Sequence, residues 1–358
     1  MTACHFLVPG SLDRPTGGSR YDRRIIDGLR AAGLAVHVDE LPGCFPDADA
    51  IARQAVAAAL ARIPDGRVVV IDGLVLGRLA AAVKPHAGRL RIHALVHHPL
   101  ADETGVDPAR VQQLISDETR ALDVATRVIA TSAFTARRLN ALGLHHGEVD
   151  VIPPGCTPRP LATGRPGQPP LLLCVASITP RKAQHHLIEA LAGVVDRSWE
   201  CQLIGSSELD PDYAAAVARQ RDAQGLRDRV SINGAADEQR LDAAYRHADL
   251  FVLPSVYEGY GMVISEAIAY GLPVITTTGG ALATTLPPEA GIAVPPDDPA
   301  ALRDAIADLL DAHPRRRALA RGARRARRQL NDWDQSVALF MALIEEASPC
   351  PSNSPPAG

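Results

Sequence analysis

The chain has 358 residues, a length that favours two domains over one. Hydrophobic residues make up 46% of it and charged residues 22%, which is typical of globular domains and excludes a largely disordered chain. The formal net charge of −4 argues against a nucleic-acid-binding protein, which would be strongly basic.

The N-terminal residues, MTACHFLVPG, lack the charged region and the apolar stretch of a signal peptide. Apolar runs elsewhere stay well short of the ~20 residues that span a bilayer. The six cysteines form no CxxC pair, and two of them, Cys174 and Cys201, lie in apolar runs. That usage is typical of buried thiols in a reducing compartment, so we expect a cytoplasmic protein.

Short apolar runs alternate with helical patterns along the chain. Most of the runs are apolar on both faces, as strands buried in a parallel sheet are. Predicted strands cover 5–8, 67–71, 92–96, 127–130, 171–175, 201–204, 249–253 and 273–276. Predicted helices cover 21–32, 47–62, 108–125, 132–142, 183–195, 211–224, 237–247, 261–270 and 298–312. The alternation predicts an α/β protein with doubly wound parallel sheets.

A proline-rich segment divides this alternation into two halves. Residues 153–170 hold seven prolines and three glycines, a composition that suits neither a helix nor a central strand. The predicted division is an N-terminal domain over 1–155, a linker over 156–169, a C-terminal domain over 170–330, a helix over 331–348 and a disordered tail over 349–358.

The segment LPSVYEGYGMVISEAIAYG, residues 253–271, carries the clearest chemical signal. A strand ends at Leu253, and a glycine-containing loop leads from Glu258 into a helix that holds Glu266. The glycines let backbone N–H groups approach a phosphate or a sugar at a helix N-terminus. Both carboxylates can face the crevice at the carboxyl ends of the strands and accept bonds from sugar and ribose hydroxyls. Taken alone, Glu258 could also be a turn residue and Glu266 a solvated helix residue.

This segment resembles the EX7E motif of family-four retaining glycosyltransferases, commonly written E-G-[FY]-G-x-x-x-x-E. Further stretches that resemble the family, in family order, are LCVASITPRK at 173–182, LIGSS at 203–207, residues 230–247 and GLPVITTTGG at 271–280. The resemblance implies the GT-B fold, in which two Rossmann-like, doubly wound domains face an inter-domain cleft. It also implies that the last helix crosses back to the N-terminal domain.

The resemblance assigns donor-site roles within the C-terminal domain. Arg181 and Lys182 would hold the donor diphosphate, as two cations on a strand-to-helix loop can neutralise a leaving group. Glu258 would contact the transferred sugar, and Glu266 would bind the ribose hydroxyls. The remaining predicted donor contacts in this half are Gly205, Gly259, Tyr260 and Gly261.

The N-terminal half would bind the acceptor. Gly17 and Gly18 fit the family's Gly-Gly loop beside the donor phosphate, although a glycine pair alone is also compatible with a plain turn. His97 follows a buried strand, where the family places a His near the transferred sugar, although a strand-end His can be structural. Ser177 stands where many members have an arginine, for which Arg181 could partly substitute. Val263 stands where a proline is frequent, and Ala281 follows Gly279-Gly280 where an acidic residue is common, and these two departures leave the donor sugar open.

The predicted function is transfer of a hexose, with retention, from a UDP- or GDP-sugar to an unidentified glycan, lipid-linked or small-molecule acceptor. Because the resemblance supplies no nucleophilic carboxylate, we expect a same-face mechanism. No DxD-like metal motif lies in a suitable loop, so Arg181 and Lys182 would do the work of a metal, and no cofactor is expected. The alternatives are a nucleotide-sugar epimerase or phosphorylase of the same fold, and an inactive nucleotide-sugar-binding protein. A NAD oxidoreductase is disfavoured because no G-x-G-x-x-G follows the first strand.

Residues 315–328 hold eight arginines. One interpretation is a helix with a solvated basic face. The other is peripheral contact with anionic lipid at the inner face of the membrane.

Overall fold

The computed structural model describes residues 3–346. The tail predicted over 349–358, and the last two residues of the helix predicted over 331–348, lie outside the described residues.

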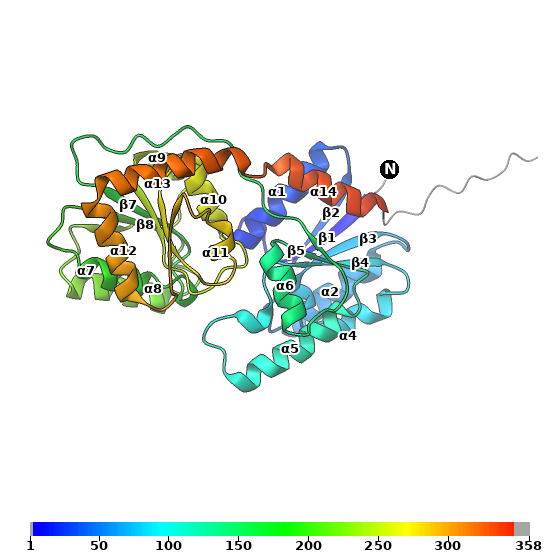
Figure 1. Ribbon diagram of the computed structural model, residues 1–358. Coiled ribbons are helices and arrows are strands. Elements are labelled where there is room, and N and C mark those ends of the chain that lie inside the picture. Colours follow the sequence, from blue (N-terminus) through cyan, green and yellow to red (C-terminus); the bar gives the residue numbers. More distant parts are fainter. Residues whose placement is uncertain (1–2, 347–358) are drawn as a thin grey trace, which may run out of the picture.

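Two six-stranded parallel sheets form the two halves of the chain (Figure 1). The first has the strand order β2-β1-β3-β4-β5-β6 and the second the order β12-β11-β10-β7-β8-β9. The strands of the first are β1 (Ala3–Pro9), β2 (Ala35–Leu41), β3 (Val68–Asp72), β4 (Arg91–Val96), β5 (Arg127–Ala130) and β6 (Val149–Val151). Those of the second are β7 (Leu171–Val175), β8 (Glu200–Ile204), β9 (Val230–Ile232), β10 (Leu250–Leu253), β11 (Val274–Thr277) and β12 (Gly291–Val294). Both orders reverse inside the sheet, so the predicted doubly wound α/β class is confirmed.

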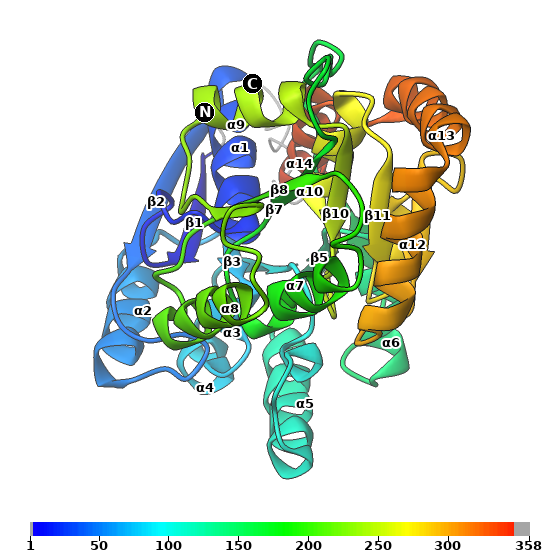
Figure 2. The same ribbon diagram turned by 90° about the vertical axis from the view of Figure 1, so that its left-hand side faces the viewer.

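Helices cover both faces of each sheet (Figures 1 and 2). In the N-terminal half they are α1 (Gly17–Ala31), α2 (Ala50–Arg62), α3 (Gly73–Leu76), α4 (Ala80–Val83), α5 (Pro108–Leu122) and α6 (Ala133–Ala141). In the C-terminal half they are α7 (Gln184–Ala192), α8 (Pro211–Ala223), α9 (Glu238–His247), α10 (Met262–Ala269), α11 (Leu282–Thr285), α12 (Pro299–Asp311) and α13 (His313–Ala326), followed by α14 (Trp333–Glu346). Many of the longer helices begin after an Asp, Ser or Thr whose side chain accepts a bond from a first-turn N–H, which explains where they start.

Four apolar clusters show which helices cover which sheet face. The C-terminal sheet packs α7, α8 and α12 on one face and α9, α10 and α13 on the other. The N-terminal sheet packs α2 to α6 on one face. Its other face is covered by α1 and α14, so the last helix returns to the first half of the chain (Figure 1). Gly28 of α1 makes this packing close, because a Cβ there would lie 2.2 Å from Val337 Cγ2 of α14.

The chain passes between the halves twice, and the two crossings touch. The segment 153–170 contains no helix or strand. Cys156 N donates to Asn331 O over 2.7 Å, and a Cβ on Gly155 would lie 2.3 Å from Trp333 N. Further along, Ala162 N donates to Tyr270 O over 2.8 Å, so the proline-rich segment runs along the surface of the C-terminal half.

The predicted strands all form, but four others were not predicted: β2, β6, β9 and β12. Each of the four is the outermost strand of its sheet. Polar residues interrupt β2, β6 and β9, as is common in edge strands that are buried less completely than central ones, and β12 is a short apolar run of four residues, GIAV. None of the helices in residues 3–346 combines the length and the apolar character needed to cross a membrane.

Candidate functional site

A cleft of about 980 Å³ lies between the two halves. It is formed where the carboxyl ends of the strands of one sheet face those of the other, at the switch points of the strand orders, β1/β3 and β7/β10. All of the site residues predicted from the sequence line this cleft: Gly17, Gly18, His97, Arg181, Lys182, Gly205, Glu258, Gly259, Tyr260, Gly261 and Glu266.

Glu258 lies at the centre of a buried ionic cluster on the loop after β10. Its side chain pairs with Lys182 Nζ, accepts from Ser255 Oγ over 2.8 Å and lies 3.3 Å from Arg181 Nη1. Burial alone would raise the pKa of Glu258, but the charges of Lys182 and Arg181 outweigh it and lower the pKa to about 2. The carboxylate is therefore ionised at every physiological pH.

The two cations come from the loop after β7. Arg181 and Lys182 lie in a short 3₁₀ turn, Pro180–Lys182, which precedes α7. Ala183 joins the two elements with φ at 51°, a left-handed conformation that is uncommon for a residue with a side chain. Arg181 Nη1 also donates to Tyr257 O over 2.9 Å, which ties the two loops together. Burial lowers the pKa of Lys182, and the charge of Glu258 opposes that change.

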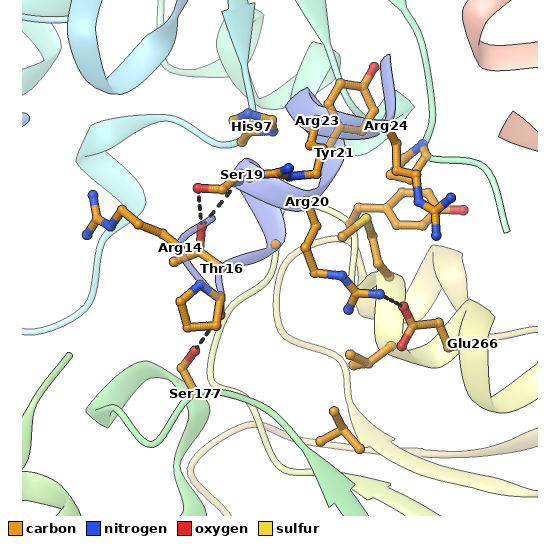
Figure 3. Close-up of a pocket in the computed structure, with 18 of the residues that line it drawn as sticks. Arg14, Thr16, Ser19, Arg20, Tyr21, Arg23, Arg24, His97, Ser177 and Glu266 are labelled. Carbon is orange, nitrogen blue, oxygen red and sulfur yellow. Dashed lines mark hydrogen bonds and ion pairs between the residues drawn. The ribbon is translucent and has the colours of Figure 1, made fainter. Parts of the chain in front are cut away.

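Glu266 lies on α10 and is met from both halves of the chain. Arg20 of α1 donates to Glu266 Oε1 over 2.6 Å (Figure 3), and the hydroxyl of Tyr245, on α9, donates to Oε2 over 3.0 Å. The side chain of Glu266 keeps 21% of its surface exposed. The carboxylate expected to bind ribose thus forms an ion pair with Arg20 of the other half.

The glycine pair lies inside a helix rather than in a loop before one. The predicted helix over 21–32 begins at Gly17, because the Thr16 hydroxyl accepts a bond from Ser19 N and caps α1 there. Gly18 faces the imidazole of His97, and a Cβ on Gly18 would lie 3.3 Å from His97 Cδ2. The prediction of a Gly-Gly loop is therefore corrected: the pair opens α1 and leaves room for His97.

His97 follows β4, as predicted, and contacts two aspartates that the sequence did not single out. Its Nε2 lies 3.2 Å from Asp22 Oδ1 and 3.3 Å from Asp72 Oδ2. Within residues 3–346, these three side chains are the one set of His, Cys, Asp or Glu with ligand atoms all within 4.8 Å of one another.

The loop that carries Glu258 is also pinned to the N-terminal half. Ser132 and Thr135, at the start of α6, direct their hydroxyls to Gly259 O over 2.6 and 3.2 Å. The Tyr257 hydroxyl donates to Asp102 Oδ2 over 2.7 Å, and that carboxylate is held in turn by the guanidinium of Arg138. These contacts fix the position of Glu258 relative to both halves.

Gly259 is required where the two halves approach most closely. A Cβ at this position would lie 2.0 Å from His97 O, so Gly259→Ala is expected to displace the loop and to reduce turnover by at least ~10-fold. Steady-state kinetics measures the loss of turnover, and circular dichroism checks that the variant is folded. Gly88→Ala is the matched control, because nothing lies within 4 Å of a Cβ there. Equal rates in the two variants would contradict the packing argument.

Sequence reasoning missed several residues of the cleft. Asp72 follows an apolar run just as His97 does, so its place at a strand end was an available signal. Arg20 and Asp22 follow the glycine pair on α1, and only the fold shows that one faces Glu266 and the other His97. Tyr245 and Ser255, which orient the two glutamates, gave no signal in the sequence.

Comparisons with known proteins find similarity to glycosyltransferases. The family model described as glycosyl transferases group 1 matches residues 169–312. D-inositol 3-phosphate glycosyltransferase of Xylanimonas cellulosilytica is 30% identical over 201 residues, which is 55% of this chain and 48% of that protein. The chain spans about half the length of the curated relatives it matches.

Two solved structures share the fold over nearly the whole chain. Sucrose-phosphate synthase from Thermosynechococcus elongatus superposes with a TM-score of 0.82 at 22% identity, over 97% of this chain and 99% of that one. HepE from Anabaena, solved in complex with UDP-glucose, gives 0.79 at 17% identity, over 97% and 100%. At these identities the likeness shows the fold, and it confirms the predicted GT-B arrangement.

Proposed function

We propose that this chain, a member of the group 1 glycosyltransferase family, transfers a hexose from a nucleotide-diphosphate sugar to an acceptor held by its N-terminal half. The observation that carries the proposal is the ionic cluster of Glu258, Arg181 and Lys182 at the carboxyl ends of the strands of the C-terminal sheet. Glu266 lies on the helix that follows Glu258. The structural likeness to a protein solved with UDP-glucose supports a nucleotide sugar as donor. Both UDP- and GDP-sugars fit the proposal.

The cations stabilise the leaving diphosphate. An ammonium offers three donors and a guanidinium five, so the bonds of Lys182 and Arg181 to Glu258 leave donors free for phosphate oxygens. Backbone N–H groups at the start of α10, after Gly261, add a favourable site for negative charge. These groups lie in a cleft where charge interactions are stronger than in water.

We infer retention by a same-face mechanism. Glu258 is engaged by Lys182, Arg181 and Ser255, and a carboxylate held by three donors is a poor nucleophile. The bond from the anomeric carbon to the diphosphate oxygen breaks, and a bond to the acceptor oxygen forms on the same face. The departing diphosphate takes the acceptor's proton, so no protein base is needed and the atoms balance.

Transfer is proposed to need no metal ion, because Arg181 and Lys182 would supply the positive charge that neutralises the diphosphate. The test is turnover with EDTA present, followed by NMR assignment of the product's anomeric configuration. The expected result is unchanged turnover and a retained anomer. Activity that EDTA abolishes and Mn²⁺ restores would contradict the metal-free proposal, and an inverted anomer would contradict retention. Phosphate-dependent products or an epimerised sugar would favour the alternative enzymes of this fold.

Peripheral membrane contact through residues 315–328 is a separate proposal. Arg315 pairs with Asp308 at 2.5 Å, and Arg316 and Arg327 donate to backbone carbonyls. The others in this segment, Arg317, Arg321, Arg324, Arg325 and Arg328, are exposed on α13 and just after it. An exposed basic helix face is the feature that anionic lipid headgroups attract.

A further inference from the structure

Three elements of the N-terminal half bring Asp22, Asp72 and His97 together at the bottom of the cleft. Asp22 lies on the second turn of α1, Asp72 ends β3, and His97 follows β4. The two aspartates are almost fully buried, at 1% and 4% exposure, whereas 18% of the His97 side chain is exposed. His97 and Asp72 both line the cleft, and His97 is the more exposed of the two.

The surroundings fix the orientation of the imidazole. The ring of Tyr21 packs edge-on against the imidazole, with the two ring centroids 5.4 Å apart. Gly18 lies next to the Cδ2 atom of the imidazole. On the backbone side, the Thr131 hydroxyl donates to His97 O over 3.3 Å. With the ring held this way, Nε2 contacts the carboxylates, and Nδ1 is the polar ring atom left for a ligand.

The cluster has two buried acidic groups and one partly exposed basic group. Asp72 Oδ1 accepts from Leu74 N over 2.7 Å, while Asp72 Oδ2 and Asp22 Oδ1 both contact His97 Nε2. Neither Asp22 Oδ1 nor His97 Nε2 forms a hydrogen bond with any other group in residues 3–346, and no Lys or Arg described there pairs with either aspartate. A buried carboxylate needs a counter-charge, and His97 is the group positioned to supply it.

The other titratable group that faces the imidazole is Tyr21, whose hydroxyl is bound to Ile152 O over 2.8 Å. Burial alone would lower the pKa of His97, but the charges of Asp22 and Asp72 outweigh it and raise the pKa to about 10. Burial raises the pKa of Asp22 to about 6, and the charge of His97 opposes that rise. The electrostatics therefore agree with the geometry.

We propose that Asp22 and Asp72 are positioning residues that keep His97 protonated on both ring nitrogens, so that Nδ1–H is a permanent hydrogen-bond donor to an oxygen of the bound nucleotide sugar. The protonation state decides the chemistry of this atom. A neutral imidazole with its proton on Nε2 would present only a lone pair at Nδ1, which accepts a bond but cannot donate one. One aspartate would suffice to place the proton on Nε2, and the second supplies the charge that retains the proton on Nδ1. The identity of the ligand rests on the proposed function, whereas the protonation of His97 does not.

The direct test is NMR of the unliganded full chain with ¹³Cε1-labelled histidine, titrated from pH 6 to 9. The signal missing in His97→Gln identifies His97. It is expected to remain that of an imidazolium throughout, and in Asp22→Asn it should titrate within this range. Asp123→Asn, an exposed aspartate of the same half, is the control that should leave the signal unchanged. An ordinary titration of His97 in the unmodified chain would overturn the proposal, as would stoichiometric metal in the purified protein together with a neutral, metal-bound imidazole.

The kinetic test uses the pH dependence of kcat/KM for the donor. Above its pKa, a group loses about tenfold of its protonated form per pH unit. Asp22→Asn is therefore expected to lose at least ~10-fold between pH 6 and 9, relative to an unmodified chain that varies little. If Asp22→Asn does not fold, Asp72→Asn gives the same comparison, because its amide oxygen still accepts from Leu74 N. Parallel pH profiles for variant and unmodified chain would reduce the aspartates to a structural role and contradict the proposal.

Discussion

Replacing Lys182 by alanine is expected to reduce turnover by at least ~100-fold. Lys182 is buried against Glu258 and faces the cleft where the diphosphate would lie. The substitution removes a positive charge from the leaving group, and it leaves Glu258 with only Arg181 and Ser255 as partners. Release of nucleoside diphosphate under single-turnover conditions measures the loss.

The chain provides a matched control for this variant. It contains only two lysines, Lys84 and Lys182, and Lys84 is exposed in the N-terminal half and does not line the cleft. Lys84→Ala should turn over donor at the unmodified rate. Lys182→Arg keeps the positive charge but changes the shape of the group that carries it. A planar guanidinium cannot take the place of a compact ammonium without displacing its neighbours. Unchanged turnover in Lys182→Ala would remove the basic loop from the proposed mechanism.

Replacing Glu258 by alanine or glutamine is expected to cost at least ~100-fold in turnover, since the carboxylate is proposed to contact the sugar and pairs with the two cations. Breaking a buried ion pair on one side also destabilises a protein by about 3–5 kcal/mol, so the melting temperature should fall as well. Glu148→Gln, an exposed residue of the other half, is the control for both measurements. A Glu258→Gln variant with normal turnover would contradict the assignment of the sugar site.

Glu258 also makes the stability of the fold depend on pH, in a direction that follows from its pKa. The pKa of Glu258 is about 2 in the folded chain, below its ordinary value of 4.5. Its ionised form therefore stabilises the fold fully above pH 4.5, and that contribution is lost as the pH falls from 4.5 towards 2. In Glu258→Gln this part of the acid sensitivity should be missing, which thermal melts across that range would show.

The central strands could be predicted from the sequence, and the edges could not. β3, β7 and β10 are buried on both faces and read as unbroken apolar runs, whereas β6 and β9 have three residues each and lie at sheet edges. The start of α1 was misplaced because two glycines are poor helix formers, and the Thr16 cap decides the boundary instead.

The residues of the cleft also divide into those that the sequence predicted and those that only the fold reveals. Glu258 and Glu266 could be singled out because they fall in one contiguous motif, and Lys182 because it falls in a second contiguous stretch that resembles the same family. Asp22 and Asp72 come from different elements and meet His97 only in the folded chain. No local sequence pattern predicts such a contact, because the residues are far apart in the chain and come together only in the fold.

A thermal-shift screen of the purified chain against UDP, GDP, ADP and their sugar conjugates, without added metal, probes the proposed donor site directly. A ligand present at 100 times its dissociation constant stabilises a protein by about 2.7 kcal/mol, which a melting curve resolves. The account predicts a shift with one nucleotide family, unchanged in Lys84→Ala and lost in Lys182→Ala. The absence of a shift with every nucleotide and nucleotide sugar would contradict a donor site in this cleft.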